Sequence, residues 1–276
     1  MYYRLLIDCQ DRKGLVYKIS KVLFEEGFNI ENQQEFVDRE NQKFFFRAVI
    51  EGEVNRETLL EKLKRELGEE CNIRLVRDRK KRLFLMATKE AHGLGDILIK
   101  WFSGDLPVEI LGVVANRENL RELVEKFGIP FYYIPAEGKS RVEHEKEMLE
   151  VIAPTNPDYI ILAKFMRILT PYFVEKFPNR IINIHHSFLP AFIGANPYKQ
   201  AYERGVKIIG ATAHFVNNNL DDGPIIEQDV IRVNHQMSWQ EMRNLGRDIE
   251  KVVLGRAIKL VIEDRVFIYG NKTIIL

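Results

Sequence analysis

Two different orders of strand-like and helix-like segments follow one another along this chain, and this succession limits its fold more than any other feature. Within residues 1–80 the hydrophobic period changes in the order strand, helix, strand, strand, helix, strand. From residue 81 to residue 276, strand-like and helix-like runs alternate. The first order predicts a ferredoxin-like βαββαβ domain, and the second predicts a Rossmann-like domain with a mostly parallel sheet. We therefore expect an α/β protein of two domains, residues 1–80 and 81–276.

Residues that start or stop helices support these boundaries. Gly27 and Gly68 follow the two helical repeats of the first domain, where glycine commonly ends a helix. Ser238, with Glu241 three residues later, predicts the capped start of a long helix that reaches residue 264. The strands are expected at 3–9, 28–37, 43–51, 71–76, 83–87, 108–115, 159–163, 180–185 and 225–233, with a closing hairpin of 266–269 and 273–276.

The balance of charges argues against two classes of partner. Lys and Arg number 41 and Asp and Glu number 40, so no basic or acidic excess indicates a nucleic acid or a membrane surface. The two cysteines, Cys9 and Cys71, lie in apolar runs and are expected to be buried free thiols, as in a reducing compartment. The N-terminus has no signal-peptide pattern, and no apolar run approaches the length of a membrane span. These features predict a cytoplasmic protein.

A run of five charged residues, Asp78 to Arg82, lies at the expected domain boundary. One interpretation is a solvated linker. The other is that Arg79–Arg82 form a basic lip for the anionic tail of a ligand.

A glycine pattern at Gly93 and Gly95 follows a strand, as in a dinucleotide-binding loop. Leu98 occupies the place of the third glycine, and no P-loop pattern occurs. A nucleotide cofactor is therefore not expected.

The apolar strand at 180–185 ends in polar residues that could perform chemistry. In an open α/β sheet, ligands bind at the carboxyl ends of the strands. Asn183 and His185 share one face of an extended strand, and His186 is expected to point away from them. An amide beside an imidazole can stabilise an oxyanion and move a proton. The alternative is two satisfied polar groups at a strand end.

A second strand, around Gly210 to Val216, carries His214 and leads to Asp221 in a polar loop. A carboxylate beside a histidine can orient it or act as a base. The alternative is that Asp221 and Asp222 only form a turn before Gly-Pro.

The three histidines also raise the question of a metal. His185 and His186, as neighbours in a strand, are expected to point to opposite faces, and the chain has no H-x-x-x-H motif or closely spaced cysteine pair. His185, His186 and His214 are therefore not expected to be metal ligands.

These motifs, taken in order, resemble the folate-dependent formyltransferase family over most of residues 83–235. The resemblance lies in Asn183-Ile-His185, Ser187-Phe-Leu-Pro190, His214-Phe-Val216 and Leu220-Asp-Asp-Gly-Pro-Ile-Ile226. It implies that Asn183, His185 and Asp221 act on the formyl group of 10-formyltetrahydrofolate, with His214 orienting Asp221. It also implies that a segment of the folate pocket lines the pterin cleft, namely Met166, Arg167, Ile168 and Leu169.

Residues 1–80 resemble an ACT domain, in Asp11-Arg-Lys-Gly14 and Glu26-Gly-Phe-Asn-Ile30. An ACT domain ahead of a formyltransferase-like domain implies a hydrolase of the formamide C–N bond, which releases formate and tetrahydrofolate and serves one-carbon metabolism and purine biosynthesis. ACT domains imply a homo-oligomer, a dimer or tetramer. They also imply an amino-acid effector near the Asp11–Gly14 loop, with Asn29 as the amide that would hold its carboxylate.

The expected mechanism needs no metal and no cofactor beyond the folate substrate. Asn183 and protonated His185 stabilise the oxyanion, while Asp221 holds the attacking water and accepts its proton. His186 and Lys164 differ from the residues typical of the transferases, and Glu90 would repel the phosphate of a transferase substrate. Two alternatives remain: formyl transfer to an amine acceptor, and an amino-acid sensor with an inactive enzyme domain.

Overall fold

The change of pattern near residue 80 coincides with a structural division of the chain. The computed structural model describes residues 1–53, 55–191 and 196–276. One unit comprises Met1–Arg79, Asp264–Phe267 and Ile274–Leu276, and the other comprises Lys80–Glu263 and Ile268–Thr273. The two units are described separately below.

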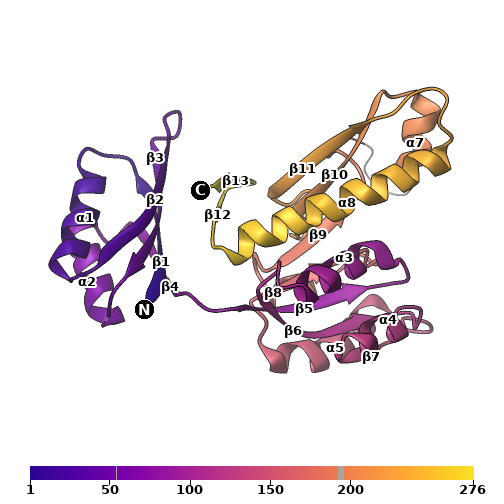
Figure 1. Ribbon diagram of the computed structural model, residues 1–276, viewed down its shortest axis with the longest axis horizontal. Coiled ribbons are helices and arrows are strands. Elements are labelled where there is room, and N and C mark those ends of the chain that lie inside the picture. Colours follow the sequence, from indigo (N-terminus) through magenta and orange to yellow (C-terminus); the bar gives the residue numbers. More distant parts are fainter. Residues whose placement is uncertain (54, 192–195) are drawn as a thin grey trace. The chain divides into compact units, whose positions relative to one another are not determined.

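The first unit contains one antiparallel sheet of four strands in the order β2-β3-β1-β4 (Figure 1). This order and the succession of its elements confirm the ferredoxin-like prediction. The elements are β1 (Tyr2–Gln10), α1 (Leu15–Glu25), β2 (Asn29–Asp38), β3 (Lys43–Glu51), α2 (Arg56–Leu67) and β4 (Asn72–Arg77).

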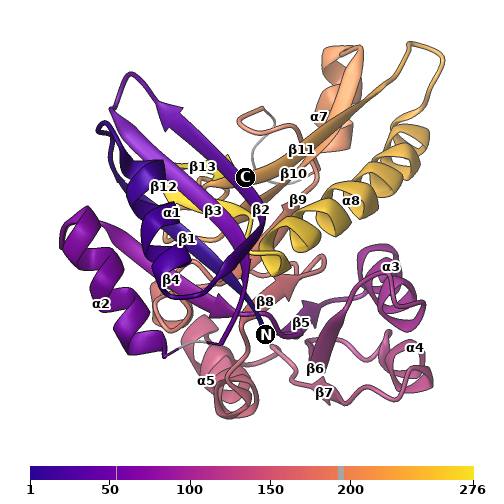
Figure 2. The same cartoon turned by 60° about the vertical axis from the view of Figure 1, so that its left-hand side comes forward.

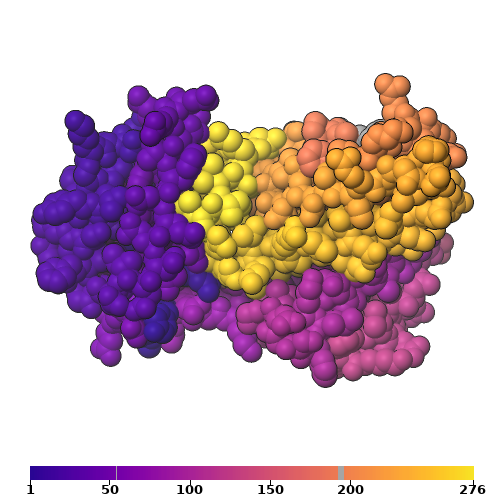
Figure 3. All heavy atoms as spheres, turned by 45° about the horizontal axis from the view of Figure 1, so that its top comes forward, coloured from indigo at the N-terminus to yellow at the C-terminus, as the bar shows by residue number. Residues whose placement is uncertain are grey.

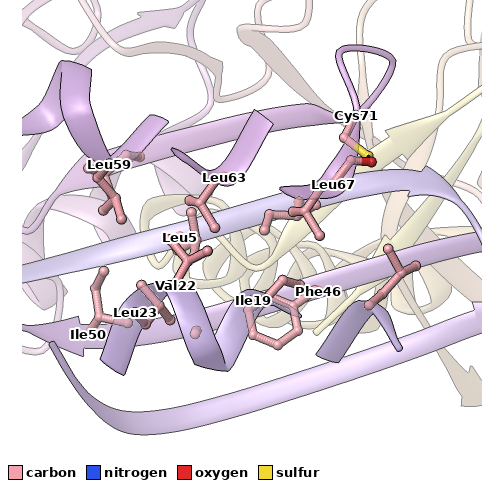
Figure 4. Close-up of a cluster of buried hydrophobic side chains, with 14 of the residues drawn as sticks. Leu5, Ile19, Val22, Leu23, Phe46, Ile50, Leu59, Leu63, Leu67 and Cys71 are labelled. Carbon is pink, nitrogen blue, oxygen red and sulfur yellow. The ribbon is translucent and has the colours of Figure 1, made fainter. Parts of the chain in front are cut away.

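Both helices cover the same face of this sheet (Figure 2). The apolar side chains of α1 and α2 repeat at helical spacing, so each helix presents one apolar stripe to the strands. Figure 4 shows that stripe against strand residues such as Leu5, Phe46 and Ile50. Cys9 and Cys71 belong to the same cluster as free, buried thiols, which confirms the prediction for both.

The other face of the sheet uses residues from the C-terminal end of the chain. Phe45 alternates with Phe44 and Phe46 along β3, and its ring meets the ring of Phe267 edge-on with centroids 5.6 Å apart. Arg4 also donates a hydrogen bond to Asp264, with 2.9 Å between the nitrogen and the oxygen. The sequence analysis assigned residues 81–276 to one domain, whereas the structure groups 264–267 and 274–276 with the first unit.

The second unit contains a sheet of seven strands in the order β11-β10-β9-β8-β5-β6-β7 (Figure 1). Strands β7, β6, β5, β8 and β9 pair in parallel, and β10 and β11 are antiparallel. The mostly parallel sheet is thus as predicted. The strands are β5 (Lys81–Ala87), β6 (Val108–Ala115), β7 (Phe131–Tyr133), β8 (Tyr159–Leu162), β9 (Ile181–His185), β10 (Ile208–Phe215) and β11 (Ile225–Arg232).

Helices cover both faces of this sheet. Helices α5 and α6 contribute to a buried cluster with strands β5, β8 and β9, whereas α3 and α7 contact the long helix α8, which packs on β9, β10 and β11. The helices are α3 (Ala91–Phe102), α4 (Arg121–Lys126), α5 (Arg141–Ile152), η1 (Ala153–Thr155), α6 (Pro171–Val174), α7 (Pro197–Arg204) and α8 (Trp239–Ile262).

Helix α8 begins as the sequence predicts. The Ser238 side chain accepts a hydrogen bond from the Glu241 backbone N–H, and the Glu241 side chain accepts one from the Ser238 backbone N–H. One side of the helix is buried and the other side lies on the surface of this unit (Figure 3). The predicted hairpin follows as β12 (Val266–Tyr269) and β13 (Lys272–Ile275).

The charged run at the boundary is only partly solvated. Lys81 is buried and opens β5, and Arg82 pairs with Glu109. Among the residues that the structure describes, no helix is long and apolar enough to cross a bilayer.

Candidate active site

A cavity of about 630 Å³ lies in the second unit, where strands β8 and β9 end. Leu162 pairs with Asn183, and Asn183 pairs with His214, so three neighbouring strands bring their polar residues to one edge. Asn183, His185, His214 and Asp221 all line this cavity, as do the predicted folate-pocket residues Met166, Arg167, Ile168 and Leu169.

His214 fixes the amide of Asn183. One ring nitrogen of His214, Nδ1, lies 2.9 Å from the backbone oxygen of Phe215 and donates to it. The other, Nε2, lies 3.3 Å from Asn183 Nδ2 and can therefore accept from it. Burial lowers the pKa of His214, although the nearby carboxylate of Asp221 acts in the opposite direction. The lowered pKa keeps the ring neutral. The amide nitrogen is thereby held through one N–H, and an amide nitrogen carries a second N–H that can donate to another acceptor.

Asp221 is the partner of His185. Asp221 Oδ2 lies 3.3 Å from His185 Nδ1, and both side chains are less than one-tenth exposed. Burial raises the pKa of Asp221, but the hydrogen bond from His185 and the electrostatic attraction of the neighbouring histidines outweigh burial, so that this pKa is lowered overall. The carboxylate is ionised at neutral pH. Nε2 of His185 is buried and has no hydrogen-bond partner among the described residues.

The backbone around Asp221 is tightly constrained. Asp221 has a φ of 54°, in the left-handed region. A Cβ on Gly223 would lie 1.6 Å from the backbone oxygen of Phe215, so only glycine fits there. The next residue, Asp222, is exposed and holds the side chain of Asn219. Asp222 therefore fits the turn interpretation, whereas the buried carboxylate of Asp221 faces two histidines.

Two details differ from the sequence analysis. His214 Nε2 lies 3.8 Å from Asp221 Oδ1, beyond hydrogen-bond distance, so His214 contacts Asn183 more closely than Asp221. His186 does not point away from the site: it lines the cavity, with its ring centroid 5.2 Å from that of His185. Strand β9 ends at His185, so the alternation of side chains stops there.

The segment from Met166 to Leu169, apolar apart from Arg167, forms a rim of the cavity and is anchored at both ends. The Met166 backbone donates to Thr88 Oγ1 at 3.0 Å, and the Thr170 backbone donates to the buried Glu145 at 2.7 Å. Met166 is 57% exposed and Ile168 is 45% exposed. Exposed apolar side chains at a cavity rim are typical of a site for a flat, largely apolar ligand.

Sequence reasoning missed the buried carboxylate Glu250, which also lines the cavity. Glu250 accepts hydrogen bonds from Tyr198 Oη at 2.6 Å and from His92 Nε2 at 2.8 Å, and lies 3.2 Å from Lys164 Nζ. Burial raises its pKa, but His92, Lys164 and Tyr198 together lower it to about 2. The available signal was a glutamate within the apolar stripe of α8, four residues after Gly246.

None of Arg79–Arg82, all of which the structure describes, lines this cavity. In the described parts of the chain, no group of three or more His, Cys, Asp or Glu side chains is placed to hold a metal ion.

Two family models match the chain. The model described as "Formyl transferase" matches residues 81–258, and the model described as "ACT domain" matches residues 3–68. Each match falls largely within one of the two structural units.

Full-length relatives share the same organisation. The chain is 56% identical to a formyltetrahydrofolate deformylase of Haemophilus influenzae, over 99% of this chain and 98% of that protein. A crystal structure of a formyltetrahydrofolate deformylase from Pseudomonas syringae superimposes with a TM-score of 0.95 at 39% identity, over 100% of this chain and 94% of that one. A glycinamide ribonucleotide transformylase from Symbiobacterium toebii gives a TM-score of 0.69 at 30% identity, over 73% of this chain and 96% of that one.

Proposed function

Because the chain belongs to the family of formyltetrahydrofolate deformylases, we propose that it hydrolyses 10-formyltetrahydrofolate to formate and tetrahydrofolate, with Asn183, His185 and Asp221 as its catalytic residues. The observation that carries this assignment is the buried Nε2 of His185. It lies in the cavity wall without a partner, while Nδ1 of the same ring is held by Asp221. A substrate oxygen is the partner that this nitrogen lacks.

The reaction balances with these groups and one water molecule. Water adds to the formyl carbon, and the formyl oxygen becomes an oxyanion that His185 and the amide of Asn183 stabilise. Asp221, ionised because of its lowered pKa, accepts a proton from the water. The bond between carbon and the folate nitrogen then breaks, and this nitrogen takes the proton. No metal is required, because the formyl carbon is itself electrophilic.

The remaining site residues have supporting roles in this proposal. His214 is a positioning residue, since it holds the Asn183 amide and lies near Asp221. Met166, Arg167, Ile168 and Leu169 form the wall of the cleft that receives the pterin.

Assay without an amine acceptor tests this proposal. The protein is incubated with 10-formyltetrahydrofolate, and formate and tetrahydrofolate are measured; equal amounts are expected. His185→Asn should abolish nearly all turnover, and His235→Asn, at an exposed histidine outside the cavity, should leave it unchanged. Formyl transfer would be favoured instead if turnover needed an amine. Binding of folate without turnover would favour a sensor.

For the first unit we propose an assembly role and an amino-acid effector. The sheet order leaves β2 and β4 at its edges, and pairing of such edges between copies would build a dimer or tetramer. The loop before α1 has Gly14 at a φ of 86°. Asn29 is exposed at the start of β2, and its side-chain amide donates a hydrogen bond to the carboxylate of Glu31. Light scattering gives the oligomer size, and calorimetry with glycine, methionine and other amino acids tests the effector.

We also propose a cytoplasmic location and a role in one-carbon metabolism, with formate supplied to purine synthesis. The two buried free thiols support a reducing compartment.

A further inference from the structure

The wall of the cavity that contains His185 includes a lysine in an unusual backbone conformation. The pairing of β8 with β9 ends at Leu162 and Asn183, and Lys164 and His185, each two residues further along the chain, both line the cavity. The Lys164 side chain is only 5% exposed, and its φ is 62°, in the left-handed region that favours glycine. A strained backbone and a buried charge at one position indicate a functional constraint.

Glu250 holds Lys164 in place through a network that also fixes an aromatic wall. Glu250 lies 3.2 Å from Lys164 Nζ and accepts a hydrogen bond from the hydroxyl of Tyr198. The Tyr198 ring lies against His186 with centroids 5.8 Å apart, and His186 lies against His185 with centroids 5.2 Å apart. The contacts therefore run without a break from the buried ion pair to the catalytic histidine.

Gly246 permits this arrangement. A Cβ at Gly246 would lie 2.1 Å from Tyr198 Oη, so the phenol passes directly over the helix backbone. Four residues later the same helix presents Glu250 to that hydroxyl. The wall is thus built by four parts of the chain: the residues after β8, the residue after β9, helix α7 and helix α8.

Hydrolysis requires only one water molecule next to the formyl carbon, whereas formyl transfer requires room for a second substrate. We propose that Lys164, together with the rings of His186 and Tyr198, fills the space beside His185 and thereby restricts the nucleophile to water. This inference rests on the proposed function and adds the determinant of its specificity. Lys164 and Tyr198 are then specificity residues, and Glu250 positions them.

Hydroxylamine, a small nucleophile, tests whether this wall excludes competitors of water. In the competing reaction a bond forms between its nitrogen and the formyl carbon, the bond from that carbon to the folate nitrogen breaks, and one proton passes from hydroxylamine to the folate nitrogen. Enzyme, 10-formyltetrahydrofolate and hydroxylamine are mixed, and formate and the N-formyl product are measured. Reaction without enzyme is subtracted.

Lys164→Gly removes the side chain and suits the positive φ. We expect the fraction of N-formyl product to rise at least tenfold over that of the unmodified protein. Lys164→Met, which keeps the length of the side chain, should stay close to the unmodified protein. Asn156→Gly relieves a positive φ of 45° outside the cavity and serves as the matched control, with no change expected.

Each outcome separates this inference from the proposed function. If the unmodified protein releases no formate, the proposed function fails. If it releases formate but Lys164→Gly gives the same product fraction, the inference is wrong. If Lys164→Met raises the fraction as much as Lys164→Gly, charge and not filled space excludes the amine, and the inference is wrong as stated. Tyr198→Ala decides the case if Lys164→Gly is inactive, since it opens the wall from α7 and should also raise the fraction.

Discussion

Two ion pairs, one in each unit of the chain, lie in opposite surroundings. In the first unit Arg12 and Glu70 pair at 2.7 Å with side chains 40% and 56% exposed. In the second unit Lys164 and Glu250 pair at 3.2 Å with side chains 5% and 1% exposed. An exposed pair contributes little to stability, whereas a buried pair is costly to form and more costly to break. The buried pair at the cavity is therefore costly to form, and this fits the positioning role proposed for Glu250.

Removing one charge from each pair should give the largest contrast. Glu250→Gln leaves the Lys164 ammonium buried without its carboxylate, and we expect it to lower the free energy of unfolding by about 3 kcal/mol. Glu70→Gln, the matched change in the first unit, should leave stability unchanged within error. Urea denaturation monitored by circular dichroism measures both. Equal effects would show that burial does not distinguish the two pairs.

Within the cavity, a second comparison separates catalytic from structural carboxylates. Asp221→Asn keeps the shape of the side chain but removes the base, and turnover is expected to fall by about two orders of magnitude while folate still binds. Asp222→Asn makes the same change at the exposed neighbouring residue, and its turnover should be close to that of the unmodified protein. Steady-state kinetics and a folate-binding titration provide the measurements. Near-normal turnover of Asp221→Asn would make this residue part of the turn only.

Acid should remove the stability that the buried pair provides. The pKa of Glu250 is about 2 in the folded protein against an ordinary 4.5, so the unfolded chain binds this proton first as the pH falls. Its contribution is fully present above about pH 4.5 and is lost progressively toward pH 2. The difference in the free energy of unfolding between the unmodified protein and Glu250→Gln should thus shrink as the pH falls from about 5 to about 3. A constant difference would contradict the lowered pKa.

Chelation should have the smallest effect of all. The proposed chemistry uses Asn183, His185 and Asp221 alone, so treatment with EDTA should leave turnover unchanged. Loss of activity that Zn²⁺ restores would instead make His185, His186 and His214 candidates for metal ligands.

Local patterns in the sequence predicted those features that depend on local physics. The helical repeats before Gly27 and Gly68 predicted α1 and α2, and Ser238 with Glu241 predicted the start of α8. The polar residues at the end of β9 predicted the cavity edge, because ligands of an open α/β sheet bind at the carboxyl ends of its strands. These predictions required no knowledge of distant contacts.

Features that depend on distant partners could not be read in the same way. Glu250 is one more charge in a helix until Tyr198, His92 and Lys164 are brought to it from other elements. The ring contact between Phe45 and Phe267 joins residues that are far apart in the sequence, so no periodicity of neighbouring residues can predict it. His186 was misplaced because strand alternation was extended one residue beyond the end of β9.

Gly246 limits how this protein can be made more thermostable by mutation. A glycine inside a helix costs roughly 0.5–1 kcal/mol relative to alanine, so Gly246→Ala is an obvious first choice for thermostabilisation. Here the added methyl group would collide with the Tyr198 hydroxyl. The substitution would gain helix propensity but push the phenol off Glu250, so a routine stabilising change would loosen selectivity at the active site.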